Sequence, residues 1–82
     1  MEKAEIRDVV LKHVRENVDG LEGVDIDTRK SMTDYSASSL DIVEVVSASM
    51  RELEINIPRT RLSDVKNLDD LVELFDQVKH QA

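Results

Sequence analysis

The spacing of apolar residues constrains the fold of this chain more than any other feature. In three segments these residues recur every three or four positions, which is typical of amphipathic helices. The segments are residues 4–18, residues 39–53 and a last stretch that follows Asn67. We therefore expect an all-α protein with three main helices. Its core must be aliphatic, because Tyr35 and Phe75 are the only aromatic residues.

Length and charge narrow the possibilities further. The 82 residues suit one small domain, residues 1–82. A formal net charge of −7 repels nucleic acid and anionic membranes, so we expect neither as a partner and expect basic protein surfaces instead. The chain has no cysteine and therefore no thiol chemistry. Because no apolar run could span a bilayer and no signal-peptide region is present, we expect a cytoplasmic protein.

The segment between the first two helices is long and polar. We expect the first helix to end near Asp19 and Gly20, where glycine permits a left-handed stop. Glycine, aspartate, serine and threonine then dominate residues 21–38, which predicts a loop of a length that is often functional. The side chains expected to fix this loop to the core are Val24, Ile26, Met32 and Tyr35.

The helix predicted over residues 39–53 has more apolar surface than one neighbour can cover. One apolar stripe contains Ile42, Val45, Val46, Ser49 and Leu53. A second stripe contains Leu40, Val43, Ser47 and Met50. Since a helix packed on one side needs one stripe, the second must meet either another helix or an external partner. Residues 59–65 predict a short helical turn held by Leu62 and Val65, and Asn67 is a suitable N-cap for the last helix.

Ser39 is the main candidate for chemistry, because it lies where the long loop meets a helix N-terminus. Unpaired N–H groups and the positive end of the helix dipole favour a phosphate at such a place. The simpler interpretation is that Ser39 is only the N-cap residue of the helix, a position at which serine is strongly preferred.

The segment Ser39-Leu40-Asp41-Ile42-Val43-Glu44 resembles the stretch that follows the attachment serine in acyl carrier proteins. The element order and Asn56-Ile57-Pro58 are also similar to that family. The resemblance implies a four-helix bundle in which Ser39 receives 4′-phosphopantetheine from a phosphopantetheinyl transferase. The thiol of this arm would hold acyl groups as thioesters, and the protein would have no catalytic activity of its own. The family usually has aspartate before this serine, whereas this chain has Ser38, so that either serine is open to modification.

The resemblance also makes the second helix the surface that partner enzymes recognise. The partner-binding residues expected there are Leu40, Asp41, Val43, Glu44, Ser47, Met50 and Arg51. Arg51, together with the basic segment Arg59, Arg61 and Lys66, distinguishes the chain from carriers of fatty-acid synthesis.

The segment Leu53-Glu54-Ile55-Asn56-Ile57-Pro58-Arg59, with Lys66-Asn67, is similar to freestanding donor carriers of polyketide β-branching. The partners implied are ketosynthase-like and hydroxymethylglutaryl-synthase-like enzymes, with the carrier acting as a monomer that holds an acetyl group. Two alternatives stay open: a carrier of fatty-acid synthesis, and an unmodified helical protein-interaction module.

Other candidate sites are weaker. Asp25-Ile26-Asp27 matches the start of a calcium loop, but Arg29 takes the next ligand position. No residue spacing predicts a metal site or a base beside Ser39. His13 and His80 have no companion at ligand spacing, and we expect them at the surface or at helix ends.

Overall fold

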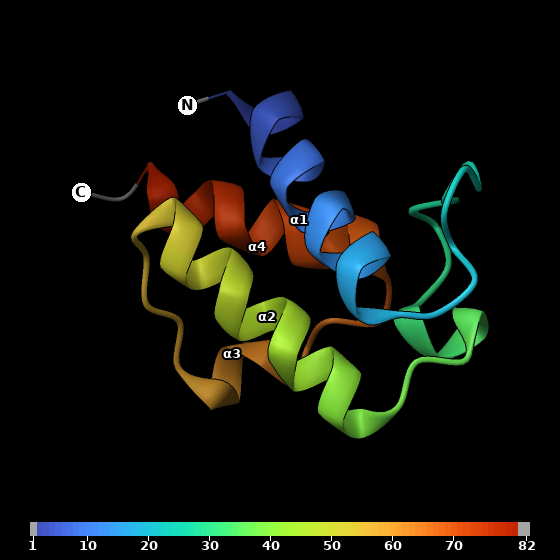
Figure 1. Cartoon of the computed structure of the whole chain (residues 1–82). Coiled ribbons are helices and arrows are strands. Elements are labelled where there is room, and N and C mark those ends of the chain that lie inside the picture. The colour runs from blue at the N-terminus through green and yellow to red at the C-terminus, as the bar shows by residue number, and fades with distance from the viewer. Residues whose placement is uncertain (1, 81–82) are drawn as a thin grey trace.

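The computed structural model describes residues 2–80, except for the side chain of Arg59. The described residues form helices α1 (Lys3–Asn17), α2 (Ser39–Leu53), α3 (Arg59–Leu62) and α4 (Leu68–Lys79), with a 3-10 turn η1 (Met32–Tyr35) in the long loop. Figure 1 shows α1 above α2, α4 behind them and α3 below α2. The prediction of an all-α bundle with three main helices, one short helix and a long first loop is confirmed.

The core is aliphatic around one aromatic side chain, as the composition requires. Phe75 of α4 is fully buried, and so are Ile6, Val10 and Val14 of α1 and Val45 and Leu53 of α2. These positions have helical spacing, so each helix turns one continuous stripe inward. The first predicted stripe of α2 is therefore the core stripe, although Ile42 is only half-buried.

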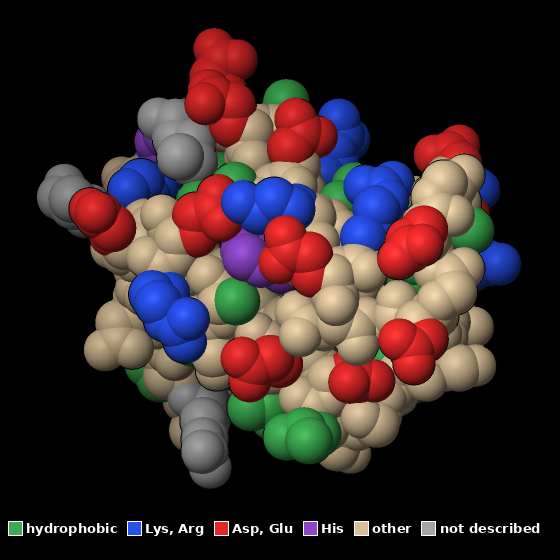
Figure 2. All heavy atoms as spheres, in the orientation of Figure 1, with side chains coloured by type: hydrophobic (Ala, Val, Ile, Leu, Met, Phe, Trp, Pro, Cys, Tyr) green, Lys and Arg blue, Asp and Glu red, His purple; other side chains and the backbone are tan. Residues whose placement is uncertain are grey.

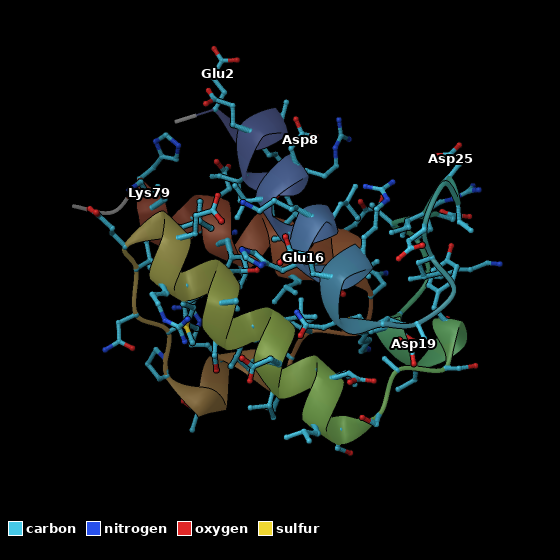
Figure 3. All side chains as sticks on the ribbon, in the orientation of Figure 1. Glu2, Asp8, Glu16, Asp19, Asp25 and Lys79 are labelled. Atoms are coloured by element: carbon cyan, nitrogen blue, oxygen red, sulfur yellow. The ribbon has the colours of Figure 1, made fainter. Side chains whose placement is uncertain are left out.

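The ends of the helices follow local signals in the sequence. Asn67 is the N-cap of α4, because its Oδ1 accepts a hydrogen bond from the Asp70 N–H at 2.8 Å. The predicted end of α1 was slightly late: the C-cap is Val18, which is extended and buried, and Gly20 follows at φ +84°. At the other end of the molecule, Lys79 of α4 lies beside the end of α2 (Figure 3) and donates to the Leu53 carbonyl at 2.8 Å.

The long loop is fixed to the body mostly as expected. Ile26 and Met32 are buried, and the Tyr35 hydroxyl accepts a hydrogen bond from the Asp27 N–H at 2.7 Å. The expectation for Val24 was wrong, because this side chain is 38% exposed near the loop tip. The loop also holds the start of α4: the N–H groups of Leu68 and Asp69 donate to carbonyls of residues 30 and 28.

The expectation for His13 was also wrong. This side chain is 9% exposed at the contact of α1 with α2, where its Nε2 lies 2.9 Å from Glu52 Oε1. Lys12 Nζ donates to the same oxygen at 2.6 Å. The hydrogen bonds from Lys12 and then from His13 lower the pKa of the Glu52 carboxyl. His13 is buried because it occupies the inner side of α1 next to Val14. The expectation failed because it was based only on the polar character of histidine.

Candidate functional site

The first turn of α2 is closed by Ser38, not by Ser39. Ser38 has the extended backbone of an N-cap residue, with φ −78° and ψ 167°. Its Oγ accepts a hydrogen bond from the Asp41 N–H, and Asp41 Oδ2 accepts one from the Ser38 N–H, both at 3.1 Å. This is a reciprocal capping box, which needs a carboxylate three residues after the cap. Asp41 stands at that spacing from Ser38, so the simpler interpretation of Ser39 as the N-cap residue was wrong.

Ser39 therefore does not cap the helix. It is the first residue of α2, and its side chain is exposed. Among residues 2–80, nothing forms a hydrogen bond with its hydroxyl, and the N–H groups of Ser39 and Leu40 also have no acceptor. An attached phosphate would meet these two N–H groups and the positive end of the helix dipole. The hydroxyl is therefore open to a modifying enzyme and suited to a phosphodiester.

The chain just before α2 is also held in place. Ser31 and Asp34 form a second capping box at the start of η1, with Asp34 Oδ2 accepting from the Ser31 N–H at 2.9 Å. Ser36 ends η1 in the left-handed conformation, and the Ala37 N–H donates to the Met32 carbonyl at 3.2 Å. These contacts set the direction in which the chain enters α2 and so the side on which Ser39 faces outward.

The residues beside Ser39 form an exposed apolar and acidic surface. Leu40 is 75% and Val43 57% exposed, and they are the two most exposed large apolar residues that the structure describes. Glu44 is exposed, whereas Asp41 is half-buried and engaged in the capping box. Figure 2 shows apolar side chains at the lower edge of this face, with acidic side chains above them. This arrangement suits a partner protein whose docking surface is apolar and bordered by basic side chains.

A groove adjoins the second apolar stripe of α2, which contains Leu40, Val43, Ser47 and Met50. It has a volume of about 780 Å³ and is lined by α2, the turn η1, residues 57–66 around α3 and the start of α4. Val43, Ser47 and Met50 line it from α2, and Leu62 and Val65 line it from the opposite wall. The second stripe is divided: Ser47 and Met50 are half-buried and line the groove, and Leu40 and Val43 remain exposed.

Sequence reasoning missed two features of this site. The first is the capping role of Ser38, although the Ser-x-x-Asp spacing signals it and recurs at Ser31. The second is the groove, because the position of α3 against α2 leaves no periodic signal in the chain. Arg51 is exposed in the last turn of α2.

The described residues offer no competing chemistry at Ser39. Both histidines lie on other elements, with His13 on α1 and His80 at the end of α4. No group of three potential metal ligands occurs among residues 2–80. In the candidate calcium segment, the Asp27 carboxylate accepts hydrogen bonds from the guanidinium and then from the backbone N–H of Arg29, which lower the pKa of this carboxyl. Asp25 lies apart at the outer tip of the loop (Figure 3).

Comparison with known proteins agrees with this geometry. Residues 9–75 match the family model described as the phosphopantetheine attachment site. The chain is 31% identical over 80 residues to the polyketide biosynthesis acyl-carrier protein AcpK of Bacillus subtilis (strain 168), covering 96% of this chain and 98% of that one. It also matches a chain in the crystal structure of the curacin biosynthetic pathway HMG synthase in complex with an acetyl-donor acyl carrier protein. That match has a TM-score of 0.85 and 28% identity, and covers 94% of this chain and 99% of the other.

These findings confirm the expected family and its cofactor. No helix within residues 2–80 combines the length and apolar character needed to cross a bilayer. The family model is described as a phosphopantetheine attachment site, and the residues that it matches include α2 with Ser39 at its start. The chain belongs to the acyl carrier proteins that depend on phosphopantetheine.

Proposed function

We propose that Ser39 is the attachment point of the 4′-phosphopantetheine arm, and that Ser38 is not modified. The observation that carries this proposal is the division of roles between the two serines. The Ser38 hydroxyl is engaged with the Asp41 N–H at 3.1 Å, whereas the Ser39 hydroxyl is exposed and makes no hydrogen bond with the described residues. A transferase can reach the second hydroxyl without opening the helix cap.

The group carried on the arm is an acyl thioester, and we propose that it is a small one such as acetyl, used in polyketide β-branching. The support is the similarity over nearly the whole chain to a polyketide carrier and to a carrier bound to an HMG synthase. In this function the protein is a cytoplasmic monomer without catalytic activity. It exchanges between the phosphopantetheinyl transferase, ketosynthase-like enzymes and a hydroxymethylglutaryl-synthase-like enzyme.

The expected mechanism is tethering. The arm holds the acyl group close to whichever enzyme binds α2, which raises the local concentration of substrate there. Leu40, Val43 and Glu44 are exposed beside Ser39 and form the contact surface for these enzymes. Docking of this kind is weak and fast, and salt weakens it by screening.

The test is modification in vitro. The protein is incubated with a broad-specificity phosphopantetheinyl transferase and coenzyme A, and its intact mass is then recorded. We expect the mass of one arm to be added to the wild type and to Ser38→Ala, and nothing to Ser39→Ala. Addition to Ser39→Ala would move the site elsewhere, and absence of any addition to the wild type would contradict the carrier function of this chain.

A further inference from the structure

The capping box at the start of α2 encloses the two residues that lie between Ser38 and Asp41. The Ser38 N–H donates to Asp41 Oδ2 and the Asp41 N–H donates to Ser38 Oγ, both at 3.1 Å. The Ser38 carbonyl also accepts a hydrogen bond from the Ile42 N–H at 3.0 Å. Ser39 and Leu40 are exposed, and their N–H groups donate to none of the described residues. They therefore lie in a short segment that is held only at its two ends.

Asp41 can serve this segment in one of two ways. The resemblance to acyl carrier proteins predicts that it contacts partner enzymes, and its Oδ1 forms no hydrogen bond with the described residues. The structure instead uses Oδ2 to close the first turn of α2, and the side chain is half-buried. Glu44, three residues later on α2, is exposed and forms no hydrogen bond or ion pair with the described residues. Glu44 is thus free to meet a partner, whereas a partner that took Asp41 Oδ2 would open the cap.

We propose that Asp41 is a positioning residue for attachment of the arm, acting through the capping box and not through its charge. This inference rests on the proposed function. The box keeps the first turn of α2 formed, so that the Ser39 hydroxyl and the two unpaired N–H groups reach the transferase together. When a cap is lost the end of a helix frays. The apparent affinity of the transferase then falls with the fraction of molecules in which the turn is formed.

Three substitutions separate the box from the charge. Glutamine three residues after a serine N-cap still accepts from the cap N–H, so Asp41→Gln keeps the box and removes the charge. Asp41→Ala removes both the charge and the acceptor of the Ser38 N–H. Ser38→Ala removes the other hydrogen bond of the box and leaves the Asp41 carboxylate in place.

The experiment measures kcat/KM for transfer of the arm from coenzyme A by a broad-specificity phosphopantetheinyl transferase. It is run well below the melting temperature of every variant, where circular dichroism shows complete folding, so that global stability cannot alter the rate. We expect about two- to fivefold lower kcat/KM for Asp41→Ala and for Ser38→Ala, which still gains the arm but more slowly. Asp41→Gln should remain within about twofold of the wild type.

Asp8→Asn is the control for net charge. Asp8 is exposed on α1, away from the start of α2 (Figure 3), and forms no ion pair with the described residues. The substitution removes the same charge as Asp41→Gln, and we expect the wild-type rate.

Three results would overturn the inference. If Asp41→Gln is as slow as Asp41→Ala, the loss of charge accounts for the effect and Asp41 is a contact residue. Wild-type rates for both Asp41→Ala and Ser38→Ala would mean that the box serves stability only. An equal loss in Asp8→Asn would mean that net charge governs transfer. Intact mass is recorded first, because a wild type that gains no arm contradicts the proposed function itself and the inference with it.

Discussion

Replacing Ser38 by alanine tests the division of roles between the two serines through stability alone. The substitution removes the Oγ that accepts from the Asp41 N–H at 3.1 Å. Loss of a serine N-cap costs about 1 kcal/mol, within a range of about 0.5–2. In a domain of this size, about 1 kcal/mol lowers the melting temperature by about 4–8 °C.

The assay is thermal and urea unfolding followed by circular dichroism. Ser39→Ala is the matched control, because it deletes the same hydroxyl one residue later, where no hydrogen bond with the described residues is lost. We expect Ser39→Ala to retain wild-type stability, since alanine is a good helix former, and we expect Ser38→Asp to retain the cap. The reasoning is refuted if Ser38→Ala is as stable as the wild type, or if Ser39→Ala loses as much stability.

Three further outcomes are expected. Ser49 is fully buried and its hydroxyl forms no hydrogen bond with the described residues, so Ser49→Ala should raise the free energy of unfolding by about 1 kcal/mol in urea titration; a loss would show that the hydroxyl is satisfied. Phe75→Ala removes the largest fully buried side chain and should cost about 3–5 kcal/mol, leaving little cooperative unfolding by circular dichroism; near-normal stability would contradict the assigned core. Hydrogen bonds from Lys12 and Lys3 lower the pKa values of Glu52 and Glu73, so these carboxylates contribute to the free energy of unfolding above the usual glutamate pKa of 4.5, and the contribution is lost as pH falls through the lowered values. In acid titration, Glu52→Gln should lose less stability than the wild type, and an unchanged profile would argue against the Glu52 contacts.

Helix positions could be predicted because they depend on periodicity and on local caps. The second helix was predicted over residues 39–53 and is observed there, since its apolar spacing begins at Leu40 and ends at Leu53. The N-cap Asn67 was likewise visible, because its hydrogen bond joins residues three apart. Features of this kind require no knowledge of which helices touch.

The remaining features depend on contacts between distant residues. His13 is buried because α1 packs on α2 and brings Glu52 within 2.9 Å of its ring, across a sequence separation of 39 residues. The groove beside Met50 exists only once α3 has folded back against α2. The N-cap of α2 is a different case, because it depends on neighbouring residues and serine is favoured at an N-cap whether it is Ser38 or Ser39. The spacing to Asp41 decides between them.

Locating the arm within the wild-type protein tests the central claim most directly. Cleavage after Lys30 and Arg51 releases one peptide that contains six serines, Ser38 and Ser39 among them. Fragmentation of this peptide, after transfer of the arm from coenzyme A, assigns the added mass to one of these residues. We predict that the mass appears between the fragments that end at Ser38 and at Ser39, which places the arm on Ser39. Added mass already present in the fragment that ends at Ser38 would contradict the account, because the capping hydroxyl would then be the one modified.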